Sequence, residues 1–139
     1  MIVPCLFAQG GEVSGAILTN FLTATTTLGT ATGDLKGGIG VDVLKTTPLN
    51  NGNIIFHNQH HWVTESGDTI SLGEADATAI PTSIPGLFAV NYPPIPVLGG
   101  TGRFASATGN IAIFGAVDLN KGQVILRYQG KISFAQQQQ

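Results

Sequence analysis

Leu98-Gly99-Gly100-Thr101-Gly102-Arg103-Phe104-Ala105-Ser106-Ala107-Thr108-Gly109 carries the clearest signal of the fold. It is rich in glycine, so the backbone can take conformations with positive φ that residues with side chains avoid. The segment 103–107 leaves room for about one helical turn, and Gly109 then ends it. Beyond Gly109 the chain has the pattern of a strand, a turn and a second strand. The stretch is therefore predicted to form a corner that leads into a β-hairpin.

A phosphate-binding loop is the alternative interpretation of such a glycine-rich run. However, the run lacks the lysine of a P-loop and the third glycine of a dinucleotide-binding motif. The segment after it also has a β-hairpin pattern, whereas an anion site needs a long helix with a free N-terminus. The sequence therefore disfavours nucleotide binding, and we expect no cofactor.

Alternating apolar and polar residues extend outward from this corner in both directions. The segment 123–134 places Val124, Leu126, Tyr128, Ile132 and Phe134 on one face and polar residues on the other. Segments 12–19, 23–35, 39–43, 53–65, 69–80 and 110–118 are also strand-like, with turn residues between them. We therefore predict an all-β fold, a closed antiparallel β-barrel of about eight strands with a lipocalin-like shape.

Length and composition place limits on the kind of protein. The 139 residues fit a single domain over 1–139, with 1–10 and 135–139 expected to be peripheral or disordered. Charged residues make up only 10% and the mean hydropathy is +0.24, so a monomer has little charge for its surface. This favours a homo-oligomer or a secreted protein with an uncharged polar surface. A net charge of −2 argues against nucleic acid as a partner.

The chain start and its only cysteine give little further information. One cysteine, Cys5, excludes an intrachain disulfide. The apolar opening lacks a positively charged n-region, so no complete signal peptide is visible and the compartment, secreted or cytoplasmic, stays open. No apolar run is long enough to cross a bilayer as a helix, and we expect no membrane span.

The segment 53–65 carries the candidate polar and aromatic groups of a pocket. Strand alternation puts Phe56, Asn58, His60 and Trp62 on one face, and Leu126 and Tyr128 have matching positions in the last strand. Aromatic walls with a few polar groups are typical of a site for a small apolar ligand. An ordinary barrel core has the same pattern, and that alternative stays open. We predict substrate-binding roles for Phe56, Asn58, Trp62, Leu126 and Tyr128.

Two carboxylates and one imidazole are the candidates for proton transfer. Glu74 and Asp76 lie two residues apart in a strand, so we expect them on one face with Ile70 and Leu72. If that face is the barrel interior, apolar surroundings raise the carboxyl pKa and suit it to acid–base catalysis. The alternative places both carboxylates in solvent at the barrel mouth. The predicted catalytic residues are therefore Glu74, Asp76 and His60. His60 could move a proton or donate a hydrogen bond.

Metal binding is the other interpretation of the histidines. In a strand, adjacent His60 and His61 point to opposite faces, and His57 lies about 13 Å from His61. These three side chains alone cannot hold one ion, so no metal is expected. The proline-rich segment 81–96 is predicted to be a long irregular connection, either functional or a loop that closes one end of the barrel.

The glycine corner also carries a resemblance. Gly99-Gly100-Thr101-Gly102-Arg103-Phe104, then Ala107-Thr108-Gly109 and two β-rich segments, resembles the allene oxide cyclase and dirigent-like β-barrel family. The resemblance implies a cofactor-independent cyclase or isomerase in natural-product biosynthesis. Such a barrel binds a small, largely apolar natural-product or oxylipin-like intermediate in its lumen and steers ring closure or stereochemistry. It also implies a trimer. Arg103 and Phe104 match the motif and are expected to fix the corner, whereas no catalytic residue of the family falls on the candidates above.

A second hypothesis is a non-catalytic barrel that binds a small ligand or has a structural role outside the cell. The scarcity of reactive side chains favours it. The state of the lumen separates the two hypotheses: a cavity with polar groups supports the enzyme, and a lumen filled by side chains supports the structural role.

Overall fold

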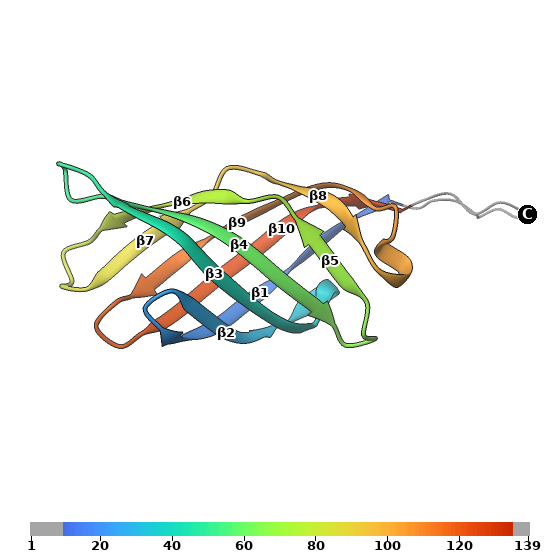
Figure 1. The fold of residues 1–139 in the computed structure, drawn as a ribbon, viewed down its shortest axis with the longest axis horizontal. Coiled ribbons are helices and arrows are strands. Elements are labelled where there is room, and N and C mark those ends of the chain that lie inside the picture. The colour runs from blue at the N-terminus through green and yellow to red at the C-terminus, as the bar shows by residue number, and fades with distance from the viewer. Residues whose placement is uncertain (1–9, 135–139) are drawn as a thin grey trace, which may run out of the picture.

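The computed structural model describes residues 10–134, and the predictions for Cys5 and for the two chain ends lie outside these residues. Ten strands and two short 3-10 helices make up this part of the chain (Figure 1). Their bounds are β1 (Gly10–Thr23), β2 (Thr26–Ala31), η2 (Gly33–Leu35), β3 (Gly37–Pro48), β4 (Ile54–Thr64), β5 (Thr69–Leu72), β6 (Ala75–Pro81), β7 (Leu87–Asn91), β8 (Ile95–Gly100), η3 (Gly102–Phe104), β9 (Thr108–Asp118) and β10 (Gln123–Ser133).

The strands close into an antiparallel barrel. The sheet runs β10-β1-β2-β3-β4-β5-β8-β9-β7-β6, and further pairings join β10 to β9 and β4 to β6. Because β5 and β6 follow one another along β4, and β8 and β7 follow one another along β9, the ten strands occupy eight positions around the wall. Each described strand pairs on both sides, which removes the exposed edges of an open sheet. The prediction of a closed barrel of about eight strands is confirmed.

One end of the barrel is closed by η2 and by two aromatic residues. The Trp62 indole N–H donates to the Leu35 carbonyl oxygen at 2.9 Å. The Tyr128 hydroxyl accepts from the Leu35 N–H at 2.8 Å and donates to the Thr32 carbonyl at 2.7 Å. The two rings meet edge to face, with centroids 5.0 Å apart. A Cβ at Gly15 would collide with both the Thr32 carbonyl and the Tyr128 hydroxyl, so this closure requires glycine there.

The glycine-rich corner lies at the same end, between β8 and β9 (Figure 1, orange). Gly102 has φ of +59°, and a Cβ on it would overlap the Asp68 carboxylate. The predicted helical turn is present as η3, whose Phe104 is fully buried. The Arg103 guanidinium lies 4.6 Å from the centre of the Phe104 ring and 4.0 Å from Asp68. The contacts of the glycine-rich corner therefore have a structural role.

The proline-rich segment 81–96 is predicted to be an irregular connection, and the structure contradicts this prediction. It forms two regular strands, β7 and β8, which both pair with β9. Pro81 ends β6, Pro85 lies in a turn, and Pro93 and Pro94 join the two strands, where ladder donors are not required, whereas Pro96 lies within β8. The segment is thus part of the barrel wall.

A row of apolar side chains crosses the outer surface of five neighbouring strands. Cross-strand pairing links, in order, Leu18, Ile125, Ala116, Ala89 and Ile80. The three larger side chains, Leu18, Ile125 and Ile80, are about half exposed. We call these five residues the outer apolar row.

Candidate ligand site in the barrel lumen

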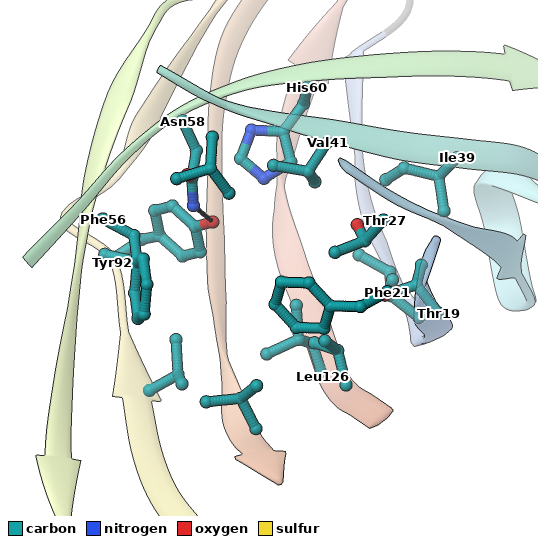
Figure 2. Close-up of a pocket in the computed structure, with 16 residues that line it drawn as sticks. Thr19, Phe21, Thr27, Ile39, Val41, Phe56, Asn58, His60, Tyr92 and Leu126 are labelled. Carbon is teal, nitrogen blue, oxygen red and sulfur yellow. Dashed lines mark hydrogen bonds between the residues drawn. The ribbon is translucent and has the colours of Figure 1, made fainter. Parts of the chain in front are cut away.

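A cavity of about 50 Å³ lies inside the barrel, away from the end that Trp62 and Tyr128 close. Its wall is almost entirely apolar. Figure 2 shows the lining residues, which are Ile17, Thr19, Phe21, Thr27, Ile39, Val41, Val43, Phe56, Asn58, His60, Ala77, Val90, Tyr92, Val117, Val124 and Leu126. Since one water needs roughly 10–15 Å³ measured in this way, the cavity has room for a few waters in this conformation.

Three polar side chains gather on one side of this cavity. Asn58 and His60 project inward from β4, and Tyr92 follows β7. The Asn58 amide N–H donates to the Tyr92 hydroxyl oxygen at 2.7 Å, as the dashed line in Figure 2 shows. The His60 and Tyr92 rings meet edge to face, with centroids 5.2 Å apart. We call Asn58, His60 and Tyr92 the lumen polar cluster.

Three atoms of this cluster have no hydrogen-bond partner in the described part of the chain. They are Oδ1 of Asn58 and both ring nitrogens of His60. The two side chains belong to residues only 6% and 3% exposed. Buried polar atoms are almost always paired, because leaving one unpaired costs the full free energy of its desolvation. Unpaired atoms that border a cavity therefore indicate a place for a partner.

Burial keeps the cluster uncharged at neutral pH. Desolvation, together with nearby His61, lowers the pKa of His60 to about 4. Desolvation raises the pKa of Tyr92 to about 12, although the hydrogen bond from Asn58 opposes this shift. His60 is therefore a neutral imidazole with one donor and one acceptor nitrogen, and Tyr92 is a neutral phenol. The cluster can bind, orient and exchange hydrogen bonds with a neutral ligand.

The wall is interrupted beside the cluster. On one side His60 pairs with Val41 of β3, but on the other side β4 changes partner from β6 to β5 between Asn58 and His61. The Gln59 side chain bridges this gap by donating to the Leu72 carbonyl at 2.9 Å. An irregular ladder next to a site is a common way to redirect side chains. Here the change of partner along β4 leaves the Glu74 and Asp76 carboxylates outside the lumen.

Glu74 and Asp76 lie on the outer surface, so the expectation that they share a face with Ile70 and Leu72 is wrong. Ile70 and Leu72 are buried, whereas Glu74 and Asp76 are exposed. The reason is the break between β5 and β6: a slip of one residue exchanges the two faces of a strand. From Ala75 onward it is the alanines that point inward.

The two carboxylates instead hold His57 on the outside of the barrel. Asp76 lies 2.6 Å from Nδ1 of His57, and Glu74 lies 2.7 Å from Nε2. These hydrogen bonds, that of Asp76 first and then that of Glu74, raise the pKa of His57 above its usual value. All three side chains are substantially exposed, so the cluster is a surface ion pair with little effect on stability.

The other predicted site residues divide between the cavity and the closed end. Phe56, Asn58, His60 and Leu126 line the cavity. Trp62 and Tyr128 point inward as predicted but lie outside the cavity lining, because their polar atoms are bonded to the backbone around η2. Their assignment as pocket residues is not supported by this geometry.

Tyr92 is the main site residue that sequence reasoning missed. It lies in the proline-rich segment that was predicted to be irregular. The available signal was the alternation of Val90 and Tyr92, both of which are buried and line the cavity. The histidines follow strand alternation: His60 faces inward, while His57 and His61 face outward and bond to carboxylates.

The strand pairing and the lumen define the class: a closed antiparallel β-barrel with a small polar cluster in an apolar interior. Among solved structures the chain is similar to the pterocarpan synthase dirigent protein GePTS1, with 13% identity, a TM-score of 0.40, and coverage of 99% of this chain and 91% of that chain. No family model matches the sequence, and no curated protein does. A similarity this low supports no conclusion about function. The function is therefore inferred from the side chains that line the lumen. None of the described helices is long and apolar enough to span a bilayer.

Proposed function

We propose that the barrel binds a small, largely apolar ligand in its lumen, with the polar group of the ligand against the lumen polar cluster. The observation that carries the proposal is the set of unpaired buried atoms on Asn58 and His60 beside an apolar cavity. A ligand that pairs these atoms recovers the free energy that the empty site loses. Apolar surface from the surrounding wall supplies the rest of the affinity.

Binding requires the lumen to widen. Ligand pockets usually measure roughly 300–1,000 Å³, and the cavity here is about 50 Å³. Phe21 and Phe56 line it and are only partly buried, so their rings have room to turn outward. A ligand therefore selects a more open arrangement of these side chains, at a cost that limits its affinity.

The finer part of the proposal is catalytic and follows the resemblance of the glycine corner. Under this catalytic proposal, the barrel is a cofactor-independent cyclase or isomerase. It holds a natural-product-like intermediate in one shape and excludes water during ring closure. His60, with Asn58 and Tyr92, takes the polar role. Glu74 and Asp76 have no part in it, because they lie outside the lumen. The small cavity favours a second candidate, a barrel that binds its ligand without chemistry.

A cavity-filling substitution tests the binding proposal. We expect 4-ethylphenol, added to isotopically labelled protein, to shift the NMR signals of Phe56, Asn58 and Leu126. Leu126→Trp should abolish these shifts, because the larger ring occupies the cavity, and Val124→Phe provides a second filling variant. Gln129→Trp is the matched control, since Gln129 is exposed on the same strand. Shifts that persist in both folded filling variants would show that the ligand binds elsewhere.

The outer apolar row supports the homo-oligomer that composition favours. Its five residues would bury apolar surface against a second copy of the chain, in keeping with a charged content of only 10%. We expect light scattering to give a multiple of the 14.4 kDa chain mass, with a trimer as the expected state, and Ile125→Asp to lower that mass. A monomer at micromolar concentration would contradict this.

A further inference from the structure

The lumen polar cluster discriminates between kinds of polar group. On the basis of the proposed function, we propose that the ligand is a neutral molecule whose buried polar group is one hydroxyl, as in an alcohol or a phenol. Carboxylates, and molecules that have no donor, are disfavoured. This assigns a chemical class to the ligand from the hydrogen-bonding capacity of three named atoms.

The unpaired atoms require both a donor and an acceptor from the ligand. Oδ1 of Asn58 can only accept, because an amide oxygen carries no hydrogen, and the amide nitrogen of the same side chain already donates to Tyr92. Neutral His60 presents one accepting nitrogen and one N–H. A hydroxyl is the smallest group that donates to one atom and accepts from another. It can therefore donate to Oδ1 of Asn58 and receive the His60 N–H at the same time, which pairs two of the three atoms.

Groups that only accept leave part of the cluster unpaired. An ether or ketone oxygen can receive the His60 N–H, but Oδ1 of Asn58 then stays without a partner. A hydrocarbon pairs none of the three atoms. A site built to bond a hydroxyl rejects an analogue without it strongly, because its buried polar atoms stay unpaired.

Carboxylates are disfavoured because the cavity wall formed by residues 10–134 holds no lysine or arginine side chain. Apart from His60, the lining residues are apolar or uncharged polar side chains. The charged residues Asp42, Asp76 and Arg127 each stand next to a lining residue in sequence, but all three are exposed on the outer face of their strands. A carboxylate in the lumen would lose its hydration without gaining a partner charge.

The affinity for a neutral hydroxyl ligand should not change between pH 5 and pH 8. Among the described residues, His60 and Tyr92 are the titratable groups that line the cavity. Burial lowers the pKa of His60 to about 4 and raises that of Tyr92 to about 12, so both stay neutral over this range. The His61 ring lies on the opposite face, where its Nε2 is 3.0 Å from the Asp42 carboxylate.

Three probes of similar shape test the inference: 4-ethylphenol, 1-ethyl-4-fluorobenzene and 4-ethylbenzoate, titrated into the full chain at pH 7 by calorimetry. We expect the phenol to bind at least ten times more tightly than either of the others. His60→Leu should reduce this preference severalfold while the fluoro compound still binds. The phenol titration repeated at pH 5 and pH 8 should give the same dissociation constant.

The outcomes separate this inference from the proposed function. Tightest binding by the benzoate, or equal binding by the phenol and the fluoro compound, would overturn the hydroxyl assignment and leave a ligand-binding lumen intact. A preference for the phenol that survives in His60→Leu and varies with pH would also overturn it. Absence of binding by all three probes would overturn both, because the apolar cavity would then take no ligand.

Discussion

Trp62→Ala is expected to lower the free energy of unfolding by about 3–5 kcal/mol, the usual range for removing a buried tryptophan. Trp62 is 1% exposed and packs edge to face on Tyr128. Its indole N–H also holds the Leu35 carbonyl, so the substitution leaves a cavity and frees η2 from the barrel end. Urea unfolding at a fixed protein concentration measures the change, because an oligomer makes stability depend on concentration.

Two controls separate the packing of Trp62 from its hydrogen bond. Trp62→Phe keeps an aromatic ring against Tyr128 but loses the donor to Leu35, so we expect a smaller loss, with about 1–3 kcal/mol from the unpaired carbonyl. Leu98→Ala removes a side chain that is 66% exposed and should change stability by less than about 0.5 kcal/mol. A loss in Trp62→Ala no larger than that in Leu98→Ala would contradict the role of this end in holding the barrel closed.

Strand alternation was sufficient to predict which side chains of β4 and β10 share a face. Asn58, His60 and Trp62 on β4, with Leu126 and Tyr128 on β10, all point inward as predicted. Each of these strands runs unbroken for eleven residues, along which successive side chains alternate between the two faces. The glycine corner was likewise predictable, because positive φ at several neighbouring positions leaves glycine as the suitable residue.

The same reasoning failed for Glu74 because it assumed an unbroken strand. The segment 69–80 is two strands, and the break at Gly73 and Glu74 exchanges the faces of everything after it. Gly73 donates its N–H to the Pro96 carbonyl of the neighbouring strand at 3.0 Å, a contact between residues far apart in sequence. Local alternation carries no information about such a contact, so the position of the slip could not be predicted.

The sequence did not indicate Tyr92 as a site residue, because the prolines around it favour an irregular segment over a strand. Strands β7 and β8 are short and meet at Pro93 and Pro94, where no ladder donor is needed. Which segments pair with β9 is decided by closure of the whole barrel. The position of Trp62 and Tyr128 has a similar cause. Their inward direction was predictable, but their contact with η2 depends on tertiary packing.

His60→Leu is expected to make the protein more stable while reducing its preference for a hydroxyl ligand severalfold. Both His60 nitrogens are buried without a hydrogen-bond partner among residues 10–134, and relieving such desolvation should contribute about 1–3 kcal/mol to the free energy of unfolding. Leucine has a similar volume and matches the apolar wall. Ligand affinity falls in the same variant because the accepting and donating nitrogens are gone. A site residue that lowers stability but is needed for function is typical of binding sites.

The pH dependence of stability gives a second, independent measure of His60. Its pKa is lowered from 6.5 to about 4 in the folded protein, so folding favours the neutral ring. The unfolded chain therefore binds more protons, and this contribution to stability is present above pH 6.5 and lost as the pH falls toward 4. His60→Leu should flatten the unfolding free energy over this window, whereas the matched variant His61→Leu, on the outer face, should retain the slope and the ligand preference. If His60→Leu instead destabilised the barrel and kept the slope, His60 would be a paired structural residue and the lumen polar cluster would not be a ligand site.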